Sequence, residues 1–250
     1  NFVKRLFFME INVDENVHFQ ALNRIVRESK DSDITISGCV GQRYIADGLS
    51  GKRIVINGVP GNALGAYMNG CEVIVHGNVQ EATGDTMNGG KIIVYGSAGD
   101  ATGYAMRGGR IYIRDNTGYR AGIHMKAYMD FKPAIVIGGR AGSFLGEYQA
   151  GGVIVVLGQN TDGLPIINNF CGTGMHGGVM YLRCDNIPRS LPRQIATERK
   201  WGADIAELCE LVRDWCNYFP EYDAEKLLAH NFFVLTPNSA NPYKQMYTNN

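Results

Sequence analysis

Short runs of isoleucine and valine recur along the chain at a spacing of 19 residues, separated by glycines and polar residues. The strictest runs are Ile54–Ile56, Val73–Val75, Ile92–Val94 and Ile111–Ile113. A fixed short period with one strand-like run per period predicts repeated units that bury their apolar side chains against one another. The period is too short for a strand–helix unit of roughly 30 residues, and no helical pattern lies between the runs.

The same runs predict the fold class. The period starts loosely after Asp33, is shifted by an insertion of five residues after Met125, and resumes at Ile135–Ile137. A last, looser run lies at Val179–Leu182. Stacked parallel strands are the arrangement that fits such short units. The prediction is therefore an all-β core in the form of a right-handed, single-stranded parallel β-helix of about seven 19-residue turns.

Glycines follow the period too, and we interpret them as corners. Each turn must bend sharply several times, and glycine reaches the positive φ angles that such bends require. The predicted structural corner glycines are Gly58, Gly65, Gly70, Gly77, Gly84, Gly89, Gly96, Gly103, Gly108 and Gly122. A methionine column at positions 68, 87, 106 and 125 is expected to fill equivalent sites inside the corners.

Side-chain alternation predicts an apolar stripe on the outside of the strands. The first and third residues of each strict run are always Ile or Val, so they should point into the core. The residues between them face outward and are also apolar: Val55, Ile74, Ile93, Tyr112, Val136 and Val155. An uncovered stripe of this length promotes aggregation, so either the C-terminal segment of the chain or a partner protein should cover it. The sequence leaves both coverings open.

Three regions follow from the limits of the period: an N-terminal strand and capping helix (1–32), the β-helix domain (33–185), and a C-terminal helical extension and tail (186–250). The capping helix is expected over Val17–Glu28 and should hide the open end of the first turn. The extension contains apolar residues at helical spacing over 203–219, and a final strand is expected at 232–235.

Composition excludes several classes of protein. Lys plus Arg and Asp plus Glu both number 24, so no basic excess indicates binding to nucleic acid or to an anionic membrane. No apolar run approaches the roughly 18 residues of a membrane span. The six cysteines show no C-x-x-C pair, which favours reduced thiols in a cytoplasmic protein over a metal site.

No constellation of catalytic residues emerges from the motifs. A G-x-G-x-x-G occurs at Gly172, Gly174 and Gly177, but it lies between two predicted strands, whereas a dinucleotide site needs a strand before it and a helix after it. The acids that a carbohydrate-cleaving site would pair fall in different columns. We therefore predict no catalytic, cofactor-binding or metal-ligating residue. The sequence does not determine the oligomeric state, and a homo-oligomer is one possibility.

Three segments carry a family resemblance: Gly48–Ile56, Gly77–Gly84 and Gly174–Gly178. They resemble the G-x-G-x-G domain, the C-terminal β-helical domain of the glutamate synthase large subunit, with similarity over about Ile11–Asp185. The C subunit of formylmethanofuran dehydrogenase resembles the same repeat more distantly.

The resemblance implies a noncatalytic, bridging subunit of a glutamate synthase-like oxidoreductase in glutamate biosynthesis and nitrogen metabolism. It would join a glutaminase-like amidotransferase subunit to an FMN-dependent synthase subunit. FMN and iron–sulfur clusters are then expected on the partner subunits, with no cofactor on this chain. The alternatives are a scaffold like the formylmethanofuran dehydrogenase C subunit and, less favoured, an autonomous carbohydrate-active β-helix protein.

Overall fold

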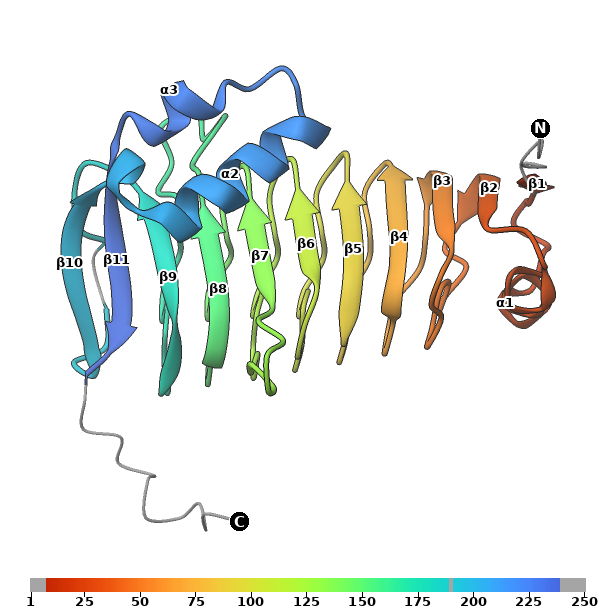
Figure 1. Cartoon of the computed structure of the whole chain (residues 1–250), viewed down its shortest axis with the longest axis horizontal. Helices are drawn as coiled ribbons and strands as arrows, with labels where there is room; N and C mark the ends of the chain where they lie inside the picture. The colour runs from red at the N-terminus through yellow and green to blue at the C-terminus, as the bar shows by residue number, and fades with distance from the viewer. Residues whose placement is uncertain (1–7, 189–190, 239–250) are drawn as a thin grey trace, which may run out of the picture.

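The computed structural model describes residues 8–188 and 191–238, which form one mixed sheet of eleven strands with a few helices (Figure 1). The strands are β1 Phe8–Asn12, β2 Asp33–Val40, β3 Arg53–Val59, β4 Asn69–His76, β5 Gly89–Val94, β6 Arg110–Ile113, β7 Ala134–Ile137, β8 Ala150–Val156, β9 Gly177–Arg183, β10 Ile195–Trp201 and β11 Asn231–Pro237. The helices are α1 Phe19–Glu28, α2 Ala206–Tyr218 and α3 Ala224–Leu228, with a 3-10 turn at Gly202–Asp204.

Strands β1 to β9 lie side by side in chain order, and every neighbouring pair among them is parallel. The register repeats the sequence period, because Ile54 lies beside Val73, Val73 beside Ile92 and Ile92 beside Ile111. At the C-terminal end the order changes to β9-β11-β10, and β11 runs antiparallel to both of its neighbours.

The predicted fold class is therefore wrong. The strands do not form a single-stranded parallel β-helix of about seven turns; they form one eleven-stranded mixed sheet with an antiparallel end. The segment 184–194 contains two prolines and no glycine, so it lacks the residues from which the earlier returns are built. Instead, β11 covers the free edge of β9, and the C-terminal region supplies two strands as well as helices. Six of the seven residues of β10 are exposed, so no apolar alternation marks this strand in the sequence.

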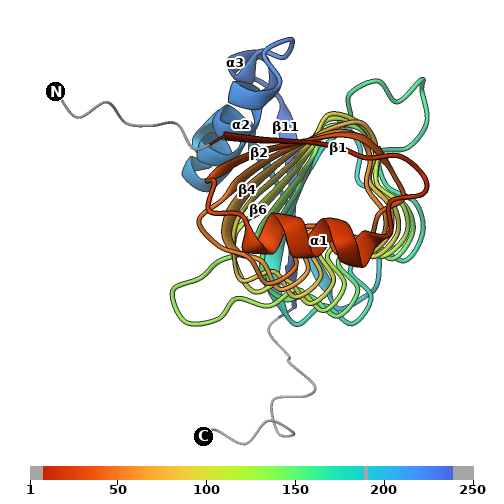
Figure 2. The same ribbon diagram turned by 90° about the vertical axis from the view of Figure 1, so that its right-hand side faces the viewer.

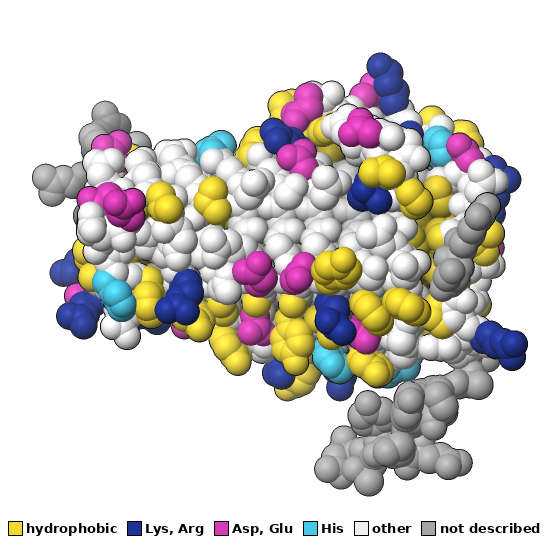
Figure 3. All heavy atoms as spheres, turned by 180° about the vertical axis from the view of Figure 1, so that it is seen from behind, with side chains coloured by type: hydrophobic (Ala, Val, Ile, Leu, Met, Phe, Trp, Pro, Cys, Tyr) yellow, Lys and Arg dark blue, Asp and Glu magenta, His cyan; other side chains and the backbone are white. Residues whose placement is uncertain are grey.

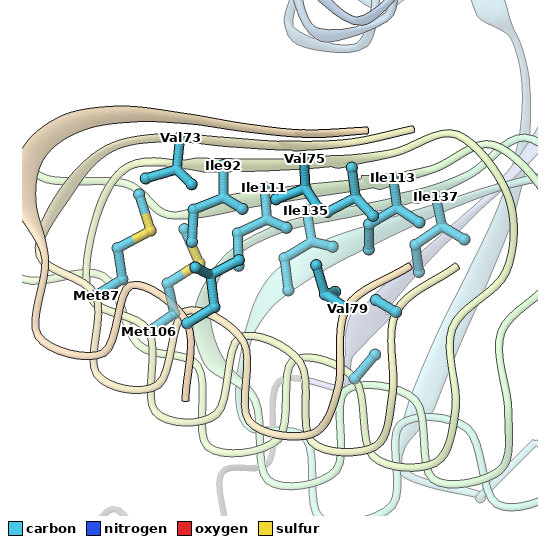
Figure 4. Close-up of a cluster of buried hydrophobic side chains, with 14 of the residues drawn as sticks. Val73, Val75, Val79, Met87, Ile92, Met106, Ile111, Ile113, Ile135 and Ile137 are labelled. Atoms are coloured by element: carbon cyan, nitrogen blue, oxygen red, sulfur yellow. The ribbon is translucent and has the colours of Figure 1, made fainter. Parts of the chain in front are cut away.

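The main core lies between the sheet and the glycine-rich segments that lead from each strand to the next. We call these the return segments, and one strand with its return a unit. Figure 4 shows the core from Val73 to Ile137, with Met87 and Met106 pointing into it from the returns. All four residues of the methionine column are fully buried. Helix α1 lies across the N-terminal end (Figure 2), where Leu22 and Val26 pack into the same core.

The predicted corner glycines fall into two physical classes. Six have positive φ, namely Gly58, Gly65, Gly70, Gly84, Gly103 and Gly122, whereas the remaining four do not. Gly77 illustrates the second class, because a Cβ there would lie 2.4 Å from the backbone oxygen of Gly58 in the preceding unit. Close approach of consecutive units thus requires glycine at Gly77, independently of the backbone angle. At Gly89 the nearest atom to such a Cβ is 3.4 Å away, an ordinary contact.

Residues other than glycine also take the left-handed conformation in the returns. One column contains Ala63, Ala82, Ala101, Arg120, Phe144 and Phe170, and a second contains Tyr67, Thr86, Ala105, His124 and Tyr148. Their φ angles lie between 48° and 63°. Such angles cost about 1–2 kcal/mol per residue, so the hydrogen bonds between neighbouring returns must offset a recurring strain.

Replacing Gly84 by Val should destabilise the sheet. Gly84 has φ +72°, and a Cβ there would lie 2.5 Å from Cδ1 of the core residue Ile111. Backbone strain and overpacking together should lower the free energy of unfolding by about 2–5 kcal/mol. The matched control is Gly48→Val, because Gly48 has φ +61° with no atom within 4 Å of the added Cβ. Chemical denaturation of both variants checks this; equal losses would show that core contact at Gly84 contributes nothing.

Candidate functional site

The outward stripe lies under the chain's own C-terminal helices. Ile93, Tyr112, Val136 and Val155 are fully buried in a second core between the sheet and α2 and α3. Figure 1 shows α2 crossing the face of the sheet. Of the six stripe residues, Val55 is the one left partly buried. The sequence predicts that either the C-terminal segment or a partner protein covers the stripe. In the structure the C-terminal segment covers it.

Trp215 anchors α2 on the sheet. Its ring is fully buried, and its Nε1 donates a hydrogen bond to the backbone oxygen of Ile113 at 3.1 Å. The ring rests against Gly138, where a Cβ would lie 2.6 Å from Cζ2 of the tryptophan. Gly138 is the first residue of a glycine-rich segment, 138–142. In the structure its missing side chain makes room for Trp215, because a Cβ at this position would overlap the indole.

Asp214 of α2 stabilises the interface between α2 and the sheet by polar contacts. Its carboxylate accepts hydrogen bonds from Tyr112 at 2.6 Å, from Arg110 at 2.8 Å and from Lys91 at 2.9 Å. Burial by itself would raise the pKa of Asp214, but the hydrogen bonds from Tyr112, Lys91 and Arg110 outweigh it and hold the pKa below its usual value. The interface beneath α2 is thus occupied by an intramolecular contact.

A different surface, at the base of the molecule, exposes large aromatic side chains. It is formed by the return segments between β5 and β9, and we call it the aromatic ridge: Tyr104, Tyr119, His124, Phe144, Tyr148 and Phe170. Figure 3 shows hydrophobic side chains gathered along this edge together with basic side chains and histidines. In the N-terminal half the equivalent left-handed positions are mostly alanine, so the ridge occupies one half of the base.

The ridge is rigid because its rings pack on one another. His124 and Tyr148 stack with their ring centroids 5.1 Å apart, and Phe144 and Phe170 stack at 4.8 Å. The guanidinium of Arg120 lies 4.9 Å from the Phe144 centroid and forms an ion pair with Glu147. Stacked rings add about 0.5–1.5 kcal/mol per pair, so the side chains are held in place before any partner arrives.

The G-x-G-x-x-G motif contributes to the packing of this ridge. Gly172 and Gly174 have positive φ, and a Cβ on Gly174 would lie 2.4 Å from Cδ1 of Tyr148. The Tyr148 ring therefore packs directly on the backbone of Gly174. At Gly177 a Cβ would lie 2.2 Å from the backbone oxygen of Ala150, which indicates close packing of units.

Sequence reasoning missed the ridge, although the period contained a signal for it. Adding the five inserted residues to the period places Phe144 below Arg120 and Tyr148 below His124. The insertion after Met125 shifts the period by five residues and so obscures this alignment.

The other candidate chemistry adds no site. Among the described residues no group of three or more His, Cys, Asp or Glu side chains could hold a metal ion. Burial raises the pKa of the Cys39 thiol to about 11, against a smaller lowering by its hydrogen bond with Gln42, and raises that of Cys171 to about 12. Both thiols are protonated at neutral pH and are poor nucleophiles. Within 8–188 and 191–238, no helix combines the length and apolar character needed to span a membrane.

A family model matches most of the chain. The sequence model of the GXGXG motif family matches residues 8–238, which extends the predicted similarity into the C-terminal strands and helices. An uncharacterized protein of Methanocaldococcus jannaschii is 41% identical over 252 residues, covering 96% of this chain and 97% of that protein.

The fold also resembles a solved chain. A chain in the crystal structure of the formyltransferase/hydrolase complex (FhcABCD) from Methylorubrum extorquens in complex with methylofuran superposes with a TM-score of 0.60. The sequence identity is 19%, and the likeness covers 92% of both chains.

Replacing Asp214 by Asn should loosen α2 at neutral pH. The substitution removes the charge from three hydrogen bonds, which should lower the free energy of unfolding by roughly 1–3 kcal/mol. Because the folded-state pKa of Asp214 is depressed, its contribution is complete above the unfolded pKa of about 3.9 and is lost as pH falls through the folded value.

The stability difference between wild type and Asp214→Asn should therefore narrow below about pH 4. Asp204→Asn is the control, because Asp204 is exposed and makes no ion pair among the described residues. Thermal melts from pH 3 to 8 measure the difference. A gap that stays constant across this range would contradict the role assigned to the carboxylate.

Proposed function

The chain belongs to the GXGXG motif family, and we propose that it serves as a scaffold subunit that positions catalytic subunits of a larger enzyme complex. The observation that carries this proposal is the aromatic ridge. Tyr119, Tyr148 and Phe170 expose 54%, 41% and 52% of their surface. The rings of Tyr148 and Phe170 are also stacked on those of His124 and Phe144.

Aromatic side chains with these properties favour protein association. They are enriched at the centres of protein interfaces, where they supply large contact area at little cost in conformational entropy. A contiguous apolar patch on a surface commonly marks a binding site for another protein. Arg120 and His124, which contact the rings, provide the polar groups that give such an interface its register. The ridge therefore suits a protein partner.

The fold likeness supports a complex that handles formyl groups. The similar chain comes from a formyltransferase/hydrolase complex, which favours the scaffold of formylmethanofuran dehydrogenase type over the glutamate synthase type. In this proposal the chain binds no cofactor and works in the cytoplasm. FMN, iron–sulfur clusters, a glutaminase-like subunit and an FMN-dependent synthase subunit would be present only if the complex is of the glutamate synthase type.

Purification of the tagged chain from its native cells tests the proposal. We expect one or more catalytic subunits to co-purify in a fixed ratio, identified by mass spectrometry as a formyltransferase or formyl hydrolase. A glutaminase-like and a flavoprotein subunit in fixed ratio would support the glutamate synthase type instead. Recovery of the chain without any stoichiometric partner would contradict a scaffold role.

The double substitution Tyr148→Ser and Phe170→Ser should release the partner while the fold remains. Loss of two interface aromatics should weaken capture by about tenfold or more. Tyr67→Ser is the matched control, because Tyr67 lies in the same column as Tyr148, is 57% exposed and lies outside the ridge. Quantitative pull-down measures retention, and thermal melts verify folding. If the folded double variant retains the partner as well as the control does, the ridge is not the interface.

A further inference from the structure

A cavity of about 820 Å³ lies at the C-terminal end of the molecule, and no residue of the aromatic ridge lines it. Its walls come from the loop between β8 and β9, from the residues that follow β9, and from His230 just before β11. Its volume falls in the range of small-molecule sites, roughly 300–1,000 Å³. Neither the scaffold role nor the covered stripe uses this cavity.

Arg183, the last residue of β9, lines the cavity with a guanidinium that is poorly paired. Among the described residues its hydrogen bond goes to the backbone oxygen of Leu157 at 3.1 Å, and its Nε is buried without a partner. No carboxylate among those residues lies within ion-pair distance of it. Asp185, the nearest acid in the wall, is directed to His230 at 3.5 Å.

The electrostatics of Arg183 follow from this isolation. Burial lowers the pKa of the guanidinium, and the attraction of Asp185 offsets that effect only in part. A half-buried cation without a matching anion is costly, and an anionic ligand would remove that cost.

The remaining wall is partly apolar and partly made of amides. Leu164, Ile166 and Ile187 supply hydrocarbon surface, and Leu164 and Ile187 are each at least half exposed. Asn168 and Asn169 add side-chain amides. The loop that bears these groups is held from outside the cavity, because Arg140 donates hydrogen bonds to Pro165 and to the Asn168 side chain. The wall is thus tied to the neighbouring unit.

We propose that this cavity binds a small organic carboxylate, with its carboxylate on the Arg183 guanidinium and its hydrocarbon part against Leu164, Ile166 and Ile187. A planar carboxylate matches the guanidinium fork. A phosphate dianion fits less well, because Asp185 places a second negative charge in the same wall. This site is independent of the scaffold role, so the two proposals fail separately.

Titration of the purified full chain with hexanoate, followed by ligand-observed NMR and calorimetry, tests the site. We expect saturable binding of one hexanoate per chain. Hexanol, which lacks the charge, and inorganic phosphate, which lacks the hydrocarbon part, should each bind about tenfold more weakly or not at all. Equal affinity for hexanol, tighter binding of phosphate, or no saturation by hexanoate up to about 10 mM would each overturn the proposal.

Variants assign the binding to Arg183. Arg183→Met keeps the aliphatic stem and should weaken hexanoate binding by about tenfold or more, whereas Arg183→Lys should retain part of it. Asp185→Asn should strengthen binding, because it removes the repelling charge. The control is Arg199→Met, since Arg199 is exposed on β10 outside the cavity. Undiminished hexanoate binding by folded Arg183→Met would overturn the assignment, and the Lys and Asn variants keep the test decisive if the Met variant misfolds.

Discussion

Backbone contact between consecutive units is the constraint on which the rest of the structure depends. From β3 to β6, and again from β7 to β8, most strand residues lie beside the residue 19 positions further along, and the returns repeat the same stacking beneath the sheet. At Gly77 the approach is so close that a Cβ would lie 2.4 Å from the oxygen of the preceding unit. Such stacking fixes the position of every column, because a unit can only adopt the register of its neighbours. The buried Ile and Val ladders and the methionines follow from it.

The same stacking produces two different surfaces. On the outer face of the sheet it aligns an apolar stripe, which the chain covers with α2 through Trp215 and the Asp214 hydrogen bonds. At the base it aligns left-handed residues, and several of their side chains contact their equivalents in the next unit. In one half of the base these residues, Arg120 apart, carry aromatic rings, and the rings stack within the exposed ridge. One surface is closed by the chain, and the other is open to a partner.

Local periodicity accounts for what the sequence could predict. The strands from β2 to β9, the helix α1, the inward ladders and the apolar stripe all follow from patterns within one or two units. The antiparallel end could not be predicted in this way, because β10 is exposed along almost its whole length and pairs with β11 across 30 or more residues of sequence. For this reason the predicted overall topology was wrong. Gly138 likewise gave no sign that it accommodates Trp215, since the partner comes from a helix far along the chain.

The central claim is that the aromatic ridge is the surface by which the chain joins its complex. Hydroxyl-radical footprinting of the chain alone and within the complex captured from native cells tests it most directly, because the tyrosines report their own exposure. The account predicts that Tyr119 and Tyr148 become protected in the complex. Tyr67, which is at least as exposed in the isolated chain but lies outside the ridge, should be oxidised to the same extent in the isolated chain and in the complex. Unchanged oxidation of the ridge, or protection of Tyr67 in its place, would contradict the account.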